Sequence, residues 1–405
     1  MAIDDDILSP ERVADPYPYF AAWREEDPVH WNEQYRAWFV HRFLDVWEGL
    51  RNPALSSDRV QPVFEHKLSP EQQHERRPTF EILEHWMVFH DPPDHTRLRR
   101  LVNQAFTPRS VQALRPRIEA VVADLLDQIG PRGSVDLIRD FAYPIPAVII
   151  AEMMGVPPED RDLFKAWSDA IMILVFGGAR VEDRRERAQR SLLELADYLR
   201  GLIRRFRADP QDNLITSLVR AKEHDDALSE DEIVSTCTLL LFGGHETTTN
   251  LIGNGMLALL RHRGQYERLG RELGLAGRAT EELLRYDPPV QVTARTATED
   301  VDLRGVHLHK GEGVVCALAA ANRDPAYVDR PEQLVIDRGE PTHLSFSNGI
   351  HHCLGAPLAR LEGQVVFAIL AHRFPSLELV STSPGYRDHF VLRGLTELTL
   401  ATGPG

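Results

Sequence analysis

Residues 346–355 read Phe-Ser-Asn-Gly-Ile-His-His-Cys-Leu-Gly and contain Cys353, one of only three cysteines in the chain. Apolar residues at helical spacing follow this stretch, so Cys353 is predicted to lie just before the N-terminus of a helix. Free backbone N–H groups at that position favour the thiolate, which is the form of cysteine that binds metals. Gly349 and Gly355 allow the backbone to approach a flat and bulky group, and Phe346 is placed to pack against the same group.

Two simpler interpretations of Cys353 stay open from the residues alone. An isolated cysteine is most often a small buried apolar side chain. His351, His352 and Cys353 also look like a zinc-site fragment, but consecutive residues rarely converge on one tetrahedral ion and no Cys-x-x-Cys partner occurs.

The ten-residue pattern as a whole is more specific. It resembles the haem-binding loop of the cytochrome P450 family, Phe-x-x-Gly-x-His-x-Cys-x-Gly, and departs from many members only by carrying Ser347 in place of glycine. The resemblance implies a haem b cofactor with Cys353 as the iron ligand.

Composition limits the class of protein. Length alone would suggest two or three domains, but no linker, repeat or low-complexity stretch divides the chain, so one domain over residues 1–405 is predicted. A net charge of −15 without a basic tail argues against a nucleic-acid partner. Neither a signal peptide nor an apolar run long enough for a membrane span is present, which predicts a cytoplasmic protein. Because eukaryotic members of the family usually carry an N-terminal anchor, the resemblance implies the soluble bacterial type.

Hydrophobic periodicity predicts a mainly α fold with small β-sheets. A hairpin over 29–40 and a short helix over 43–50 are expected first. From Arg59 to Phe89 the pattern weakens, which predicts a long irregular loop whose apolar end lines a pocket or joins the core. Further helices are expected over residues 108–129, 141–154, 158–174, 183–207 and 229–262, and strands over residues 290–320 and 377–400.

The segment Asp-Pro-Pro-Asp-His-Thr-Arg-Leu-Arg at 91–99 is expected to open a helix, because proline is tolerated in a first turn. His95 and Arg99 are four residues apart and share one face, where a solvated pair is the simple interpretation. The segment resembles the part of the P450 family that binds a haem propionate. The resemblance implies propionate contacts from His95, Arg99, Arg295 and His351.

The expected helix over 229–262 begins at a capping box, Ser229-Glu230-Asp231-Glu232. Its middle contains Gly243-Gly244, and glycines inside a helix cost roughly 1 kcal/mol each. Close helix packing or a functional distortion would explain them. The run resembles the family's oxygen-binding motif, which implies that Gly243 and Gly244 make room over the haem. Thr247 would then hold water or O2, and Glu246 would deliver protons.

Glu282 and Arg285 lie three residues apart on the next expected helix, a spacing that is usually an exposed ion pair. They match the Glu-x-x-Arg motif of the family. The resemblance implies a structural role behind the haem, with Arg338 as the third member.

The resemblance covers nearly the whole chain and implies a haem-thiolate monooxygenase that hydroxylates or epoxidises a hydrophobic small molecule with O2. The chain has no flavin or nucleotide-binding segment, so electrons are expected from outside. The resemblance implies that an iron–sulfur ferredoxin and an NAD(P)H-dependent ferredoxin reductase supply them. A peroxide-driven peroxygenase is one alternative, although relatives of that kind lose the acid–alcohol pair that Glu246-Thr247 retains. A non-catalytic haem-thiolate sensor is another, although it would need an output domain.

Apolar pocket walls are implied by the resemblance, which predicts a substrate such as a fatty acid, terpenoid, steroid or polyketide. The walls are assigned to Val88, Phe89, Ile171, Leu240, Val290, Val292 and Leu392. The apolar run 171–176 before Gly177-Gly178 is a candidate lid, although core packing explains it equally well. Arg97, Arg100 and Arg360 are expected to form a basic docking face for an acidic ferredoxin.

Overall fold

A computed structural model describes residues 5–129, 133–176, 182–223, 226–339, 342–381 and 383–402. The chain forms two compact units, each built from separated segments. Unit 1 comprises Met1–Leu55, Gln112–Pro146 and Glu246–Gly405, and unit 2 comprises Ser56–Val111 and Ala147–His245. The prediction of one domain over residues 1–405 stays a prediction.

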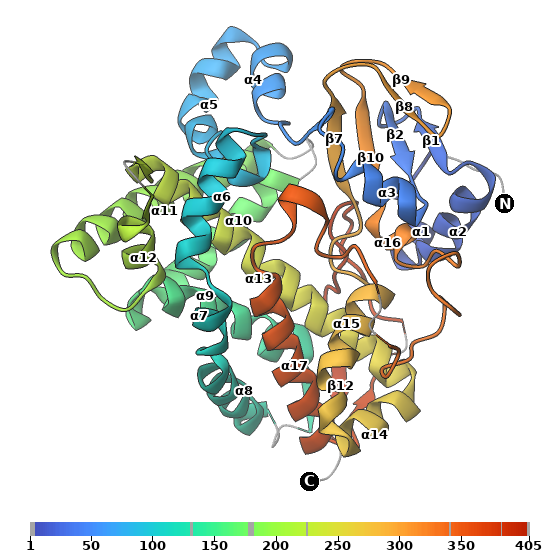
Figure 1. The fold of residues 1–405 in the computed structure, drawn as a ribbon. Helices are drawn as coiled ribbons and strands as arrows, with labels where there is room; N and C mark the ends of the chain where they lie inside the picture. The colour runs from blue at the N-terminus through green and yellow to red at the C-terminus, as the bar shows by residue number, and fades with distance from the viewer. Residues whose placement is uncertain are drawn as a thin grey trace. The chain divides into compact units, whose positions relative to one another are not determined.

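Helices dominate unit 1 (Figure 1). They are α1 (Pro10–Ala14), α2 (Tyr17–Glu26), α3 (Phe43–Gly49), α8 (Arg115–Ile129), α14 (Arg263–Arg271), α15 (Ala276–Tyr286), α16 (Leu318–Ala321) and α17 (Ala356–Arg373). Shorter turns are the π-helical η3 (Ile138–Ala142) and the 3-10 segments η5 (Leu273–Leu275) and η6 (Gly349–His351). The mainly α prediction is confirmed.

Unit 2 is also mainly helical. It contains α4 (Gln61–Lys67), α5 (Pro70–Leu83), η1 (Met87–Phe89), α6 (Asp94–Ala105), η4 (Pro158–Asp160), α10 (Arg161–Phe176), α11 (Glu182–Ala208), α12 (Leu214–Arg220) and the short strands β5 (Lys222–Glu223) and β6 (Asp226–Ala227). Three further helices, α7 (Pro108–Gln112), α9 (Pro144–Met154) and α13 (Glu230–Arg261), contribute residues to both units. Among the described ranges, none of the helices combines the length and hydrophobicity needed to span a lipid bilayer.

The largest sheet has five strands in the order β1 (Val29–Asn32), β2 (Ala37–Val40), β10 (Gly313–Cys316), β7 (Thr293–Ala297) and β3 (Leu55–Ser56). Strands β1 and β2 form the predicted hairpin, β10 runs parallel to β2, and β7 runs antiparallel to β10. Smaller sheets are β11 (Glu378–Leu379), β12 (Thr399–Ala401) and β4 (Ser134–Asp136) in that order, and the pair β8 (Val301–Leu303) and β9 (Val306–Leu308). The strands predicted within 290–320 and 377–400 are therefore present.

The predicted irregular loop from Arg59 to Phe89 is wrong, because most of it is helical. Helix α5 begins at a capping box in which Ser69 accepts from the Gln72 backbone N–H and Gln72 accepts from the Ser69 backbone N–H. The rings of Phe64 and Phe80 stack at 3.9 Å and join α4 to α5. Both helices are largely polar and exposed. They therefore lack the apolar stripe by which a helix is recognised in a sequence, and this absence led to the prediction of a loop.

In unit 1, the C-terminal half of α13 packs closely on α17 because small residues face the contact. A Cβ on Gly255 would lie 2.6 Å from the Phe367 ring, and a Cβ on Gly363 would lie 3.5 Å from Leu251. The helix is continuous from Glu230 to Arg261 and begins at the predicted capping box, so the glycines do not break it. This contact holds the segment after Glu246 beside the helix that follows Cys353.

Candidate active site

Cys353 lies in the turn between η6 and α17, two residues before the N-cap residue Gly355. Its side chain is exposed, whereas Cys237 and Cys316 are fully buried. Burial raises the pKa of Cys237 to about 12 and that of Cys316 to about 11, which keeps both thiols protonated. Cys353 is the accessible thiol among the three.

The loop around Cys353 has a fixed backbone. The Cys353 N–H donates to the carbonyl of Phe346 at 2.9 Å, which closes the loop on itself. Gly349 has a φ of +72°, and a Cβ there would lie 3.0 Å from the carbonyl oxygen of Leu50, so glycine is required. A Cβ at Gly355 would lie 3.9 Å from the sulfur of Cys353 and would occupy space beside it.

The four predicted propionate contacts belong to different units. Arg295 is on β7 in unit 1, is 4% exposed, and donates to the Ala294 carbonyl at 2.8 Å. His351 is half-buried in η6 of the same unit. His95 and Arg99 lie one turn apart on α6 in unit 2. Burial, with a smaller effect from Arg99, lowers the pKa of His95 to about 4, so its imidazole is neutral near pH 7.

Glu246 is buried, and an ion pair holds its carboxylate. Arg387 Nη1 donates to Glu246 Oε1 at 2.7 Å, and the Asn250 amide donates to the same oxygen at 3.4 Å. The Glu246 residue is 3% exposed, whereas the Arg387 side chain is 43% exposed. A Cβ at Gly394 would overlap Asn250 Oδ1 at 2.0 Å, so glycine there makes room for the amide.

The glycine pair in α13 has open surroundings within unit 2. A Cβ on Gly243 would meet nothing within 4 Å, and one on Gly244 would touch only Ile150 at 3.8 Å. Gly243 therefore leaves space at the helix surface one turn before Thr247. The role of the two glycines beside a haem stays a prediction.

Glu362 on α17 is a buried acid that the sequence reasoning missed. It is 1% exposed, and burial raises its pKa to about 8, while the Thr248 hydroxyl offsets part of that rise. Thr248 directly follows Thr247, so a second acid lies next to the polar run of α13.

Glu246 and Asn250 are four residues apart on one helix, and this spacing alone predicts that the Asn250 amide can contact the Glu246 carboxylate. Arg387 and Glu362 are more than 100 residues away, and no local pattern indicates them.

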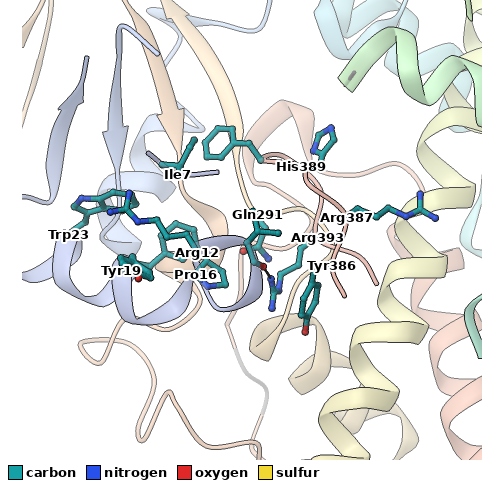
Figure 2. A pocket seen from close by; sticks show the side chains of 13 residues that line it. Ile7, Arg12, Pro16, Tyr19, Trp23, Gln291, Tyr386, Arg387, His389 and Arg393 are labelled. Carbon is teal, nitrogen blue, oxygen red and sulfur yellow. Dashed lines mark hydrogen bonds between the residues drawn. The ribbon is translucent and has the colours of Figure 1, made fainter. Parts of the chain in front are cut away.

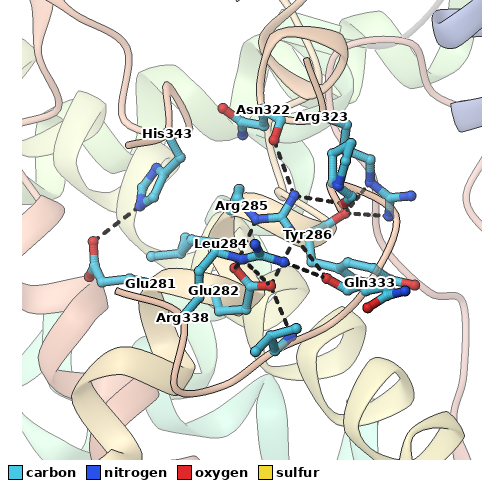
Figure 3. Close-up of polar contacts among 12 residues, drawn as sticks. Glu281, Glu282, Leu284, Arg285, Tyr286, Asn322, Arg323, Gln333, Arg338 and His343 are labelled. Carbon is cyan, nitrogen blue, oxygen red and sulfur yellow. Dashed lines mark hydrogen bonds and ion pairs between the residues drawn. The ribbon is translucent and has the colours of Figure 1, made fainter. Parts of the chain in front are cut away.

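Glu282, Arg285 and Arg338 form one buried network (Figure 3). Arg285 and Glu282 are both 0% exposed and share two hydrogen bonds of 2.8 and 2.9 Å. Arg338 Nε lies 3.1 Å from both Glu282 oxygens, and the Val335 N–H donates to Oε1 at 3.0 Å. Arg285 also donates to the Pro331 carbonyl at 2.9 Å. The network fixes the irregular segment before the cysteine loop to helix α15.

The predicted basic docking face needs correction, because each of its three arginines is already paired with carboxylates. Arg97 pairs with Glu232 and Asp226, and Arg100 pairs with Glu223. Arg360 forms two hydrogen bonds of 2.7 and 3.0 Å with Glu281. Burial opposes ionisation of Glu281, but hydrogen bonds from His343 and Arg360 outweigh it and lower the Glu281 pKa to about 2.

The seven predicted pocket residues have different environments. Val88, Phe89 and Leu240 are half-buried in unit 2, and Ile171 is fully buried there. In unit 1, Val290 and Leu392 pair in an antiparallel bridge. Val292 is 2% exposed and belongs to a core cluster that contains Tyr17, Phe20, Trp23 and Phe39. The assignment of these seven residues to a substrate pocket stays a prediction. The candidate hinge Gly177-Gly178 lies outside the described residues.

A separate hollow in unit 1 is lined by N-terminal helices and the segment 386–393 (Figure 2). Arg12, Gln291, Arg387, His389 and Arg393 contribute polar groups to its wall. Its volume of about 40 Å³ is little more than that of one water molecule in the liquid. None of the predicted pocket residues lines it, and it is too small for a hydrophobic substrate.

Comparison with known proteins gives a consistent result. The sequence model of the family described as Cytochrome P450 matches residues 55–393. The chain is 40% identical to cytochrome P450 CYP107DY1 of Priestia megaterium over 94% of both chains. It is 40% identical to the vitamin D(3) 25-hydroxylase of Pseudonocardia autotrophica, over 98% of this chain and 96% of that protein. The crystal structure of P450BioI with an acyl carrier protein ligated to hexadec-9Z-enoic acid matches with a TM-score of 0.89 and 35% identity, covering 97% and 99% of the two chains.

Proposed function

Because the chain belongs to the cytochrome P450 family, we propose that it inserts one atom of O2 into a hydrophobic small molecule, by hydroxylation or epoxidation, with haem b bound through Cys353. Haem-containing monooxygenases make up its relatives, so the enzyme class and the cofactor follow from membership. The observation that carries the assignment of the ligand is the exposed thiol of Cys353 in a closed loop before α17, while Cys237 and Cys316 are buried.

The residues of the loop suit this cofactor. A thiolate is a suitable ligand for haem iron, and glycine at 355 leaves the space beside the sulfur free of side-chain atoms. We assign the propionates to Arg295, His351, His95 and Arg99 through charge-assisted hydrogen bonds. With a pKa of about 4, His95 would donate as a neutral imidazole, which leaves the positive charge to the arginines.

Haem b held by a cysteinate supplies the electron density that favours O–O cleavage. We assign proton delivery to Glu246 and Thr247. The ion pair connects the buried carboxylate of Glu246 to the side chain of Arg387, which is 43% exposed and therefore reaches solvent. Glu246 would first take up a proton from solvent on the Arg387 side, and rotation of the protonated carboxyl away from Arg387 would carry that proton toward Thr247 Oγ1, the hydroxyl assigned to hold water or O2. Asn250 would keep the carboxylate oriented in the resting position.

Bacterial P450 enzymes depend on redox partners, and we assign this role to an iron–sulfur ferredoxin with an NAD(P)H-dependent ferredoxin reductase in the cytoplasm. Arg360 shares its guanidinium with Glu281, so an acidic partner would have to compete with that carboxylate. One relative is a vitamin D(3) 25-hydroxylase. Another, P450BioI, was crystallised in complex with an acyl carrier protein that bears hexadec-9Z-enoic acid. Both ligands are hydrophobic, which supports a substrate of that class here.

The test is a coupling measurement with Thr247→Ala, and Thr249→Ala two residues further along α13 is its control. Ferredoxin, reductase and a compound that shifts the Soret band are supplied, and product and hydrogen peroxide are measured per NAD(P)H consumed. Thr247→Ala is expected to keep its haem and its electron uptake but to divert most electrons to peroxide, because the second proton arrives too late. Full coupling in Thr247→Ala would contradict the role of the hydroxyl. Turnover with peroxide alone, as fast as with the electron chain, would instead support a peroxygenase.

A further inference from the structure

Strands β8 and β9 form a hairpin (Figure 1). One face of this hairpin is apolar and the other is polar. Val301, Leu303 and Leu308 are buried in a core cluster of unit 1. Because side chains alternate along a strand, the residues between them point outward. Asp302 lies directly opposite His307 in the register. Asp300 and His309 are each two residues away from these positions along the chain, so their side chains point to the same face. Two carboxylates and two imidazoles are thus gathered on one exposed face.

The donor atoms of this face lie close together. His307 Nε2 is 3.5 Å from Asp300 Oδ2, and His309 Nδ1 is 3.9 Å from Asp300 Oδ1. One donor atom from each of Asp300, His307 and His309 lies within 4.8 Å of the others. In a tetrahedral zinc site with metal–ligand distances near 2.0 to 2.1 Å, neighbouring ligand atoms are roughly 3.4 Å apart. Small rotations of three exposed side chains would close the remaining gap.

Two further contacts orient these groups. His307 Nδ1 lies 3.0 Å from Asp302 Oδ1, so this nitrogen donates to Asp302 and the ring is held with Nε2 facing Asp300. Loss of the Nε2 proton would free that lone pair for a metal ion. The Lys310 backbone N–H donates to Asp300 Oδ1 at 2.9 Å and holds that carboxylate in place. A carboxylate behind a histidine ligand is the usual outer contact of zinc sites, where it fixes the ring and strengthens the nitrogen donor.

We propose that Asp300, His307 and His309 bind one Zn²⁺ ion on the outer face of this hairpin, with Asp302 as the carboxylate behind His307. Two imidazole nitrogens and one carboxylate oxygen are a donor set that suits zinc, and three protein ligands leave one position for water. Cu²⁺ would compete, since it binds nitrogen donors more tightly in the Irving–Williams order. This site is independent of the haem chemistry, because the hairpin contributes no residue to the candidate active site.

Protons compete with the metal at this site. The hydrogen bond to Asp302, followed by the charges of Asp302 and Asp300, raises the pKa of His307. The Lys310 N–H, with contributions from both histidines, lowers the pKa of Asp300. Zinc requires neutral imidazole, so binding must release a proton from any His307 that is charged, and the affinity must fall as the pH decreases toward 6.

Equilibrium dialysis of the untagged, haem-loaded full chain against Zn²⁺ at pH 7.5, with metal counted per chain, tests the proposal. The wild-type protein is expected to bind one Zn²⁺ that His307→Ala and His309→Ala each lose. Asp302→Asn is expected to bind about 10 to 100 times more weakly, because the ligand ring loses its outer carboxylate. His66→Ala is the matched control, since the His66 side chain is 75% exposed and, within the described part of the chain, pairs with one carboxylate, that of Glu65 at 3.9 Å.

The side chains of His307, His309 and Asp302 are exposed, so the variants should fold, and an unchanged haem spectrum verifies this. Equal zinc binding by wild-type protein, His307→Ala, His309→Ala and His66→Ala would overturn the proposal. Absence of zinc binding by the wild-type protein at pH 7.5 would overturn it as well. Neither result would affect the monooxygenase assignment, which is measured by haem spectra and turnover.

Discussion

Replacement of Glu362 by glutamine should stabilise the protein in a pH-dependent way. Burial raises the pKa of Glu362 from its ordinary value of 4.5 to about 8 in the folded chain. Below pH 4.5 the carboxyl is protonated in both states and contributes no difference. As the pH rises from 4.5 to 8, only the unfolded chain ionises, so stability falls through this window and levels off above it. Glutamine does not titrate, and it can still contact the Thr248 hydroxyl.

The size of the effect follows from the pKa difference. A gap of about 3.5 pH units at 1.36 kcal/mol per unit gives roughly 5 kcal/mol on the plateau above pH 8, roughly 4 kcal/mol at pH 8 and roughly 3 kcal/mol at pH 7. These values are upper limits, because the amide is also buried and its own desolvation is not free. Glu362→Gln should therefore differ little from the wild type at pH 4.5 and be more stable at pH 8.

Urea unfolding of the haem-loaded proteins, followed by helical circular dichroism at several pH values, measures this difference. The exposed Glu378 on β11 supplies a control variant, Glu378→Gln, whose difference from the wild type should stay near zero throughout. A stability difference for Glu362→Gln that does not grow between pH 4.5 and 8 would refute the assignment of a neutral buried carboxyl.

Two other contacts give predictions of their own. Glu282→Ala leaves the buried guanidinium of Arg285 without its carboxylate and should cost roughly 3 to 5 kcal/mol of unfolding free energy in urea; a cost below 1 kcal/mol would mean that the network is not structural. Arg387→Ala removes the 2.7 Å partner of Glu246, so the carboxyl should hold its proton to higher pH, and the pH profile of turnover should shift upward, with little change in the substrate-induced Soret shift. If the pH profile of turnover is unchanged in Arg387→Ala, the ion pair between Arg387 and Glu246 takes no part in proton delivery.

Motifs that act locally were readable from the sequence. The capping box at Ser229 and the hairpin over 29–40 each depend on residues that are close in the chain, and both are present. The prediction of an irregular loop from Arg59 to Phe89 was wrong, because the hydrophobic pattern of this segment is weak. Its helices present few apolar residues, and the signal that remained was the Ser69–Gln72 capping box, which the periodicity argument did not use.

Partners that are distant in sequence explain most of what was missed in the site. Glu246 was assigned a proton-transfer role, but its ion pair with Arg387 joins residues 141 positions apart. Glu362 follows Cys353 on an apolar helix, and only the fold shows that burial raises its pKa. The charges at Arg97 and Arg360 were visible, whereas their neutralisation by Glu232 and Glu281 required the tertiary structure.

The hairpin of β8 and β9 is an intermediate case. Asp300, Asp302, His307 and His309 alternate with apolar residues, which is a pattern that places all four on one face of a hairpin. The turn at Gly305, with a φ of +80°, sets the register that brings the two rows opposite one another. The alternation alone predicts strands, whereas the register of the hairpin shows that its four polar side chains meet on one face.

The most direct test of the central claim is the carbon monoxide spectrum of the reduced protein with each cysteine replaced in turn. Cys353→Ser is expected to lose the red-shifted Soret band of a thiolate-bound haem–carbonyl complex, because the thiolate ligand is gone. Cys237→Ser and Cys316→Ser, which alter buried thiols, are expected to keep it. Retention of that band in Cys353→Ser would show that another residue binds the iron and would contradict the account.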